Sequence, residues 1–291
     1  MLLSINKFRG LKVKIYNLEQ HKVIVMSVKR SHRSMSMNNN FRKIIVVDAH
    51  AHLGYDCVFE HDFNLQNLLD GMEKNCIDIS IVQPGTTFDL RSAIKQHNDI
   101  AKLSKKLPGR VFGMANPNPH LPRSRYREEL ERCVKDLGFI GVKLHPFAHA
   151  VNPNSSTGRN VFEAASDLNI PVMVHTGSGI PWSLPSILAP IAKDFSNLRI
   201  ILAHSGGNLF AEEALLVAKD HPNIYLETSW TTSSAIYRFC KVLGSDRIMF
   251  GSDHPENIPT ELAKFRSIGL NQGEMEWCLG KTAIKVFNIH Y

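Results

Sequence analysis

The sequence has few cysteines, no long apolar run and no excess of charge over most of its length, and each absence excludes a class of protein. No stretch reaches the roughly 18 apolar residues that a membrane-spanning helix requires. The five cysteines among 291 residues are scattered, odd in number and never spaced as Cys-x-x-Cys. This usage argues against a disulfide framework and a CxxC zinc module, and it favours a reducing compartment. We therefore expect a cytoplasmic protein with no membrane partner.

The excess of basic residues is confined to the N-terminal end. Residues 1–43 carry ten Lys or Arg and a single acid, Glu19, whereas the remaining 248 residues carry 24 basic and 26 acidic side chains. The net charge of +7 therefore comes from this leader. A basic segment can touch anionic surfaces, but a solvated segment is the commoner case. We expect residues 1–43 to form a basic extension, either a small hairpin at 11–28 or disordered, and we expect no nucleic-acid partner.

From residue 44 the sequence alternates between short β-branched runs and segments with helical spacing. Leu65, Leu68, Leu69 and Met72, for example, follow the i, i+3, i+4, i+7 spacing of one helix face. Strands that alternate with helices pair in parallel, and eight such units predict an α/β fold, a (β/α)8 barrel of the TIM type over residues 44–291. The rival doubly wound sheet lacks its glycine-rich fingerprint after the first run. The eight runs lie near residues 44–49, 78–83, 110–115, 139–145, 171–175, 199–204, 223–228 and 247–251.

Histidines and other polar residues stand at the C-terminal ends of these runs. In a barrel of this type, those ends hold the chemistry. His50 and His52 are two residues apart and therefore point to the same face of one strand, which suits a shared metal ion. Imidazole and carboxylate together suit zinc first, and also manganese or iron. The residues at these ends are His50, His52, Lys143, His145, His175, His204 and Asp253.

These segments resemble motifs of the amidohydrolase superfamily, in the branch that contains aminocarboxymuconate-semialdehyde decarboxylase-like enzymes. The resemblance implies a divalent metal held by His50, His52 and His175, with Asp253 as a fourth ligand or as the general base. It implies that His204 is an acid–base partner, or the ligand of a second metal. The matching motifs are Asp48-Ala49-His50-Ala51-His52, Gly141-Val142-Lys143-Leu144-His145-Pro146, His175-Thr176-Gly177, His204-Ser205-Gly206-Gly207 and Gly251-Ser252-Asp253-His254-Pro255.

The fourth strand leaves two roles open. A carboxylated lysine at the end of this strand bridges two metals in some members of the superfamily, and Lys143 lies there. Lys143 could instead pair with a substrate carboxylate or with a nearby acid, and His145 offers another polar group on the same face. We expect Lys143, His145 and His204 to serve a second metal or the substrate.

The residues at the strand ends predict an enzyme. We expect a metal-dependent hydrolase in which metal-activated water attacks an amide, lactone or ester of a small anionic or cyclic substrate. Asp253 would accept the proton of that water, and the ion or His204 would stabilise developing charge. The same residues fit an alternative, a nonoxidative decarboxylase with His204 as its acid–base group. A barrel that only binds is a third reading, disfavoured by the complete set of polar residues. A homodimer is compatible with all three.

Three further residues near the strand ends carry weaker expectations. Trp182 and Trp230 follow the fifth and seventh strands, where each could wall the substrate pocket or simply pack against its neighbours. Glu227 ends the seventh strand, and we expect an ordinary salt bridge there.

Overall fold

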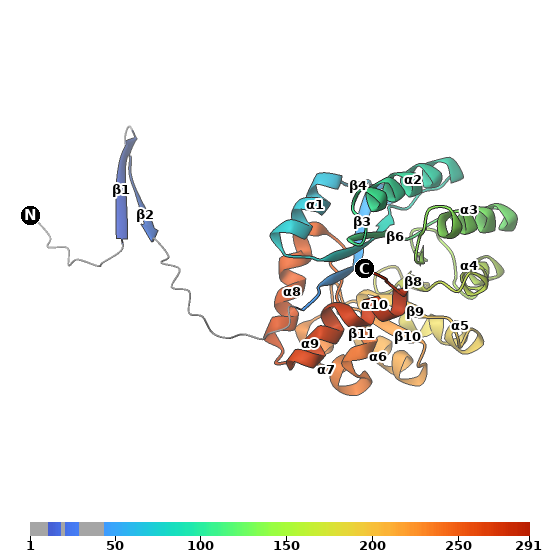
Figure 1. Ribbon diagram of the computed structural model, residues 1–291. Helices are drawn as coiled ribbons and strands as arrows, with labels where there is room; N and C mark the ends of the chain where they lie inside the picture. The colour runs from blue at the N-terminus through green and yellow to red at the C-terminus, as the bar shows by residue number, and fades with distance from the viewer. Residues whose placement is uncertain (1–10, 19–20, 29–43) are drawn as a thin grey trace, which may run out of the picture. The chain divides into compact units, whose positions relative to one another are not determined.

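The computed structural model describes the backbone of residues 11–18 and 21–28 and the whole of residues 44–291 (Figure 1). The chain divides into two compact units, Met1–Lys43 and Ile44–Tyr291. In the first unit, strand β1 (Leu11–Leu18) pairs antiparallel with β2 (His21–Val28). The disorder considered for the rest of residues 1–43 lies outside the described residues.

The second unit is a ring of parallel strands. Hydrogen-bonded pairing orders the strands of one sheet as β4 (His61–Phe63), β3 (Val47–Asp56), β5 (Ile79–Pro84) and β6 (Val111–Gly113). The strands of the other sheet are ordered β7 (Val142–Leu144), β8 (Val172–His175), β9 (Ile200–Ala203), β10 (Ile224–Glu227) and β11 (Ile248–Met249). A parallel bridge between Ala115 and Val142 joins the first sheet to the second. The ring closes at a second seam, between β3 and the segment that follows β11. There the Ala49 N–H donates to the Phe250 carbonyl at 3.0 Å and the Asp253 N–H donates to the His50 carbonyl at 2.7 Å. The predicted α/β fold with parallel strands is therefore confirmed.

Each of the eight apolar runs of the sequence overlaps one of these parallel strands. β3 continues seven residues beyond its predicted run, to Asp56, so His50 and His52 lie within the strand and not after it. A short additional strand, β4 (His61–Phe63), turns back antiparallel on the end of β3.

Helices surround the ring (Figure 1), and side chains that cap their first turns fix where several of them begin. Asn64, Asp89, Ser155 and Thr232 each accept a hydrogen bond from a backbone N–H two or three residues later. The helices are α1 (Leu65–Lys74), α2 (Leu90–Lys106), α3 (Arg123–Lys135), α4 (Ser156–Asp167), α5 (Ala189–Asp194), α6 (Ala211–Asp220), α7 (Ser233–Leu243), α8 (Ile258–Ser267), α9 (Gln272–Glu276) and α10 (Thr282–Phe287).

Two apolar cores stabilise the ring of strands and the helices around it. One fills the ring with side chains such as Ile81, Met173 and Ile201, together with Val286 and Phe287 of α10. The other lies between strands and helices and includes the large buried side chains of Leu68, Ile100, Tyr126, Phe162 and Phe239. The interior of the ring is therefore packed, and polar groups are left to its C-terminal edge.

A β-bulge in β3 decides which way the first motif points. Val47 and Ala49 belong to the core inside the ring, whereas Ala51 belongs to the core outside it. In a regular strand, alternation would put residue 51 on the same side as 47 and 49. The register of β3 against β5 shifts between Asp48 and Ala51, which is the signature of a bulge. That extra residue allows His50 and His52 to face the interior of the ring.

Neither a membrane-spanning helix nor a disulfide is present in the residues that the structure describes. Within residues 44–291, no helix is both long and apolar enough to cross a membrane. All five cysteines are free thiols, as their spacing predicts.

Candidate metal centre

Three atoms of the kind that bind metals meet at the C-terminal edge of the ring. The Nε2 atoms of His50 and His52 lie 3.2 Å apart, and each lies 3.2 Å from Oδ1 of Asp253. His50 and His52 come from β3, and Asp253 follows β11, so the seam that closes the ring brings them together. Sequence reasoning named these three residues as ligands, and the structure groups them.

The triangle of three atoms has the dimensions of a coordination site for one ion. Nitrogen and oxygen ligands bind zinc at about 2.1 Å, so two ligands lie about 3.0 Å apart at a right angle and about 3.4 Å apart at a tetrahedral angle. The observed 3.2 Å falls between these limits. Burial, with the charge of Lys143, lowers the pKa of both imidazoles below the ordinary value. Both are therefore neutral and can offer a lone pair to a cation.

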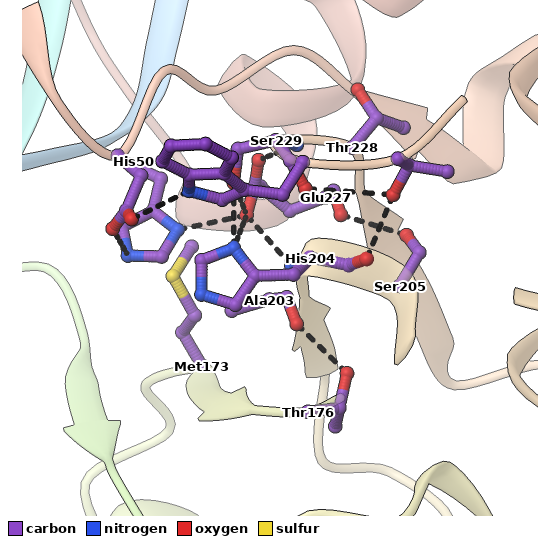
Figure 2. A network of polar contacts seen from close by, with 12 residues as sticks. His50, Met173, Thr176, Ala203, His204, Ser205, Glu227, Thr228 and Ser229 are labelled. Atoms are coloured by element: carbon purple, nitrogen blue, oxygen red, sulfur yellow. Dashed lines mark hydrogen bonds and ion pairs between the residues drawn. The ribbon is translucent and has the colours of Figure 1, made fainter. Parts of the chain in front are cut away.

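Glu227 accepts hydrogen bonds from several residues around the metal centre and so orients His50 and His204 (Figure 2). Its carboxylate is fully buried and accepts the Nδ1–H of His50 at 2.8 Å. It also accepts the backbone N–H of His204 at 3.0 Å, and the backbone N–H and hydroxyl of Ser229 at 2.6 and 2.9 Å. Because Nδ1 of His50 donates, its Nε2 carries the lone pair that faces His52 and Asp253. The expectation of an ordinary salt bridge at Glu227 was wrong.

Asp48 ties the first motif to the last. Its carboxylate accepts the backbone N–H of Ser252 at 2.9 Å and the Ser252 hydroxyl at 2.6 Å, and also the backbone N–H of His50 at 3.2 Å. Burial raises the pKa of Asp48 to about 7, against the opposing effect of the Ser252 hydrogen bonds. These bonds fix the segment Gly251–Asp253 against β3, so that Asp253 reaches the two imidazoles.

Lys143 joins the cluster, and His145 lies beside it. Nζ of Lys143 is buried and lies 2.9 Å from Nε2 of His50. Burial lowers the pKa of Lys143 to about 8, although Asp253 and other carboxylates oppose the shift. The ring of His145 stacks on that of His175, with centroids 3.9 Å apart, and its Nδ1 accepts the backbone N–H of Ala148. The roles of Lys143 and His145 toward a second metal or a substrate stay predictions.

His175 lies next to the cluster without joining it. Its Nε2 donates to the carbonyl of Ser178 at 2.9 Å, so Nδ1 holds the lone pair of the neutral ring. Burial lowers the pKa of His175 to about 4. Within residues 44–291, there are three groups whose potential ligand atoms all lie within 4.8 Å of one another, and His175 belongs to none of them. The group described above is that of His50, His52 and Asp253. Its role as a ligand stays a prediction.

His204 is held so that one ring nitrogen is free for proton transfer. The hydroxyl of Ser229 donates to Glu227, so it accepts from Nδ1–H of His204, which lies 2.8 Å away. The lone pair of His204 is therefore on Nε2. Its ring stacks on that of His50, with centroids 5.0 Å apart, and it lines the cavity above the metal centre. Burial lowers the pKa of His204 well below its usual value, which keeps the ring neutral.

The second oxygen of Asp253 is held by a residue whose contact was not foreseen. Nε1 of Trp230 donates to Oδ2 of Asp253 at 2.8 Å, although the indole is half-exposed. Trp230 thus acts on the site through Asp253. Trp182, the other tryptophan considered as a pocket wall, is not among the described residues that line the cavity above the metal centre. His204, Trp230 and Asp253 all have a φ near +60°, a strained conformation that functional sites retain.

A cavity of about 320 Å³ opens directly above the cluster. Nine of the twelve residues that line it carry aromatic rings, namely six histidines and three phenylalanines. Phe63 stacks on His52 with centroids 4.6 Å apart, and Phe59 faces His145 and Phe147 across 5.6 and 6.3 Å. A cavity lined by aromatic rings favours a flat, aromatic ligand, because offset stacking between parallel rings is stabilising.

Comparison with known proteins places these features in context. A sequence profile of the amidohydrolase family matches residues 47–289. A 2-amino-3-carboxymuconate-6-semialdehyde decarboxylase from Dictyostelium discoideum is 21% identical over an alignment of 223 positions, which covers 62% of this chain and 61% of that enzyme. The match therefore spans less than two thirds of that relative.

Solved structures resemble the fold more completely. The 5-carboxyvanillate decarboxylase of Sphingomonas paucimobilis has a TM-score of 0.70 at 14% identity, over 85% of this chain and 100% of that one. A dihydroxybenzoic acid decarboxylase of Polaromonas sp. JS666, with bound manganese and 2-nitroresorcinol, has a TM-score of 0.67 at 19% identity, over 84% and 97% of the two chains. At this identity the likeness shows a shared fold.

Proposed function

The chain belongs to the amidohydrolase family, in the branch of the aminocarboxymuconate-semialdehyde decarboxylase-like enzymes, and on this basis we propose that it is a metal-dependent, nonoxidative decarboxylase of a small aromatic acid. The observation that carries the proposal is the ring-lined cavity directly above the cluster of His50, His52 and Asp253. We take residues 44–291 as a (β/α)8 barrel that forms the catalytic unit, and residues 1–43 as an extension.

The metal would be held by His50, His52 and Asp253, with His175 as the fourth ligand. Two imidazoles and a carboxylate suit manganese, zinc or iron, and the manganese in the Polaromonas enzyme makes that ion the first to test. When bound, a divalent ion supplies a positive charge that holds substrate oxygens and stabilises negative charge as it develops. Lys143 adds a second positive charge beside the ion when it is protonated.

Decarboxylation replaces a carboxylate on a ring carbon by a proton. The carbon–carbon bond breaks, carbon dioxide leaves, and the electron pair stays with the ring carbon, which must gain one proton. His204 is the residue for this transfer, because its ring lines the cavity and the lone pair on Nε2 would take up a proton from solvent water and pass it to the ring carbon. The hydroxide left by that water would combine with the released carbon dioxide as bicarbonate. Ser229 and Glu227 fix the orientation of His204 and would stabilise its charge while Nε2 carries the proton.

Hydrolysis is the second candidate, and it was the first choice from the sequence. Oδ1 of Asp253 faces both imidazoles of the centre, which is the position of a base that takes a proton from metal-activated water. The named relatives reported above are decarboxylases, and they favour the alternative over hydrolysis.

Product analysis separates the two reactions. The full-length chain, loaded with manganese or zinc, is incubated with hydroxybenzoic and vanillic acids and, separately, with lactones and amides. We expect carbon dioxide and the decarboxylated ring from an aromatic acid, and we expect His204→Asn to lower this rate at least about 100-fold while metal content is retained. Hydrolysis of a lactone or amide without release of carbon dioxide from any acid would reject the decarboxylase.

A further inference from the structure

A hairpin places one histidine at the mouth of the cavity. We name this hairpin, residues Gly54–Phe63, the flap; in it, β4 returns antiparallel along the end of β3, with Asp56 opposite His61 and Gly54 opposite Phe63. His61 and Phe63 are two residues apart on β4, and both line the cavity. Asp62, between them, lines a different cavity on the far side of the flap. Sequence reasoning did not single out this strand.

His61 stands at the outer end of a series of aromatic rings that begins at the cluster. Its ring lies 4.5 Å from Phe63 and 5.1 Å from His254, and Nε2 of His254 lies 3.5 Å from Oδ2 of Asp253. His61 is exposed, and no hydrogen bond within residues 44–291 engages its ring nitrogens. The exposed fraction of the side chain rises outward from the floor, from 0% to 11%, 16% and 25% for His50, His52, Asp253 and His254.

The cavity offers few donors to an anionic oxygen that lies away from the cluster. Its lining contains no Lys or Arg in the described part of the chain. Asp56, which also lines it, already accepts three backbone N–H groups. Two other side chains of the lining can donate, Ser178 through its hydroxyl and His145 through its Nε2–H. His145 is stacked on His175, which belongs to the same group of strand-end residues as the cluster. A group that projects toward the mouth would meet His61.

Building on the proposed aromatic-acid substrate, we propose that His61 donates a ring N–H to a second oxygen substituent, carboxylate or phenolic, on the side of the substrate facing the mouth. The enzyme would then prefer aromatic acids that carry two oxygen substituents over the simple acid. His254 and Phe63 hold the imidazole in place through their rings, and the residues of the metal centre, with their ion, would hold the first carboxylate.

Calorimetric binding to the manganese-loaded full chain tests this assignment. The probes are benzoate and 1,3-benzenedicarboxylate, which differ by one carboxylate. A hydrogen bond to a charged group predicts that the wild type binds the dicarboxylate about tenfold more tightly than benzoate. His61→Phe should reduce this ratio to within about twofold, with benzoate affinity unchanged. His61→Gln, which keeps an N–H donor, should restore part of the ratio, and Asp62→Asn should leave it at the wild-type value.

Several results would overturn the subsite. These are a wild type that binds the two probes equally, a His61→Phe variant that keeps the preference, or a preference that is lost only in His145→Phe. The proposed reaction is tested separately: a His61-dependent preference without release of carbon dioxide from any acid would keep the subsite and reject the decarboxylase. Release of carbon dioxide without that preference would do the reverse.

Discussion

Replacing Glu227 by Gln should weaken metal binding more than any other single change outside the ligands. The carboxylate accepts four hydrogen bonds, from His50 Nδ1, His204 N, Ser229 N and Ser229 Oγ. Three of these reach Oε2, so the amide oxygen of Gln should occupy that position, which directs the amide NH₂ group toward the Ser229 N–H. The hydrogen bond from the Ser229 N–H is then lost and two donors face each other, which should lower the free energy of unfolding by about 1–3 kcal/mol.

The larger effect should fall on the metal. A neutral amide polarises His50 less than a carboxylate does, so Nε2 of His50 becomes a weaker ligand. Losing the partner of a ligating histidine typically costs 10–100-fold in metal affinity, which corresponds to about 1.4–2.7 kcal/mol. Equilibrium dialysis against buffered manganese, followed by elemental analysis, measures this change directly.

Glu129→Gln is a matched control. Glu129 is also a buried carboxylate paired with a histidine, since its Oε1 lies 2.6 Å from Nδ1 of His97. Its other partners are Arg132 and the Cys133 thiol, and it contacts none of the cluster residues. This variant should lose stability and keep its metal affinity. Wild-type manganese affinity in Glu227→Gln, or an equal loss in Glu129→Gln, would refute the reasoning.

Three further predictions address other parts of the chain. Trp230→Phe removes the N–H that holds Oδ2 of Asp253 and should lower metal affinity about threefold to tenfold by dialysis, as one hydrogen bond suggests, while an unchanged affinity would make the indole a packing residue only. Burial lowers the pKa of His149 to about 4, below its value in the unfolded chain, so its contribution to stability is present above pH 6.5 and is lost as pH falls toward 4. Urea unfolding should therefore show that the wild type loses about 2 kcal/mol more than His149→Gln between pH 8 and pH 5, and parallel losses would contradict this. Deleting residues 1–34 should leave the melting temperature within about 2 °C, since the second unit has its own cores, and an insoluble product would place the leader in the fold.

Much of the fold was predictable because it depends on local patterns. Eight β-branched runs with helical spacing between them predict parallel strands, and in the structure each run overlaps a strand. The positions of His50, His52 and Asp253 at the ends of the predicted runs were enough to predict that they would meet, because parallel strands have their C-terminal ends at one edge. The closing seam between β3 and the segment after β11 then brings them within 3.2 Å of one another.

The contacts that orient the site were not predictable from one strand at a time. Glu227 ends a strand as many structural acids do, and its hydrogen bonds to His50 and His204 depend on two other strands. The bond from Trp230 to Asp253 likewise joins two loops that sequence spacing cannot relate. β4 is only three residues long, too short for an alternation pattern to reveal, so His61 went unnoticed.

The bulge in β3 also constrains how this site can change over evolution. Upstream of the bulge, the strand directs aliphatic side chains at the interior of the ring, and downstream it directs imidazoles there. The one extra residue therefore changes which of the alternating side chains face inward. Loss of Ala49 would leave one residue of β3 opposite Ile81 of β5, so the strand would become regular with both histidines still facing the interior. Loss of Ala51 would instead make the two histidines adjacent, so that they point to opposite faces of the strand. A homologue that lacks Ala51 would therefore keep both histidines and lose their shared ion.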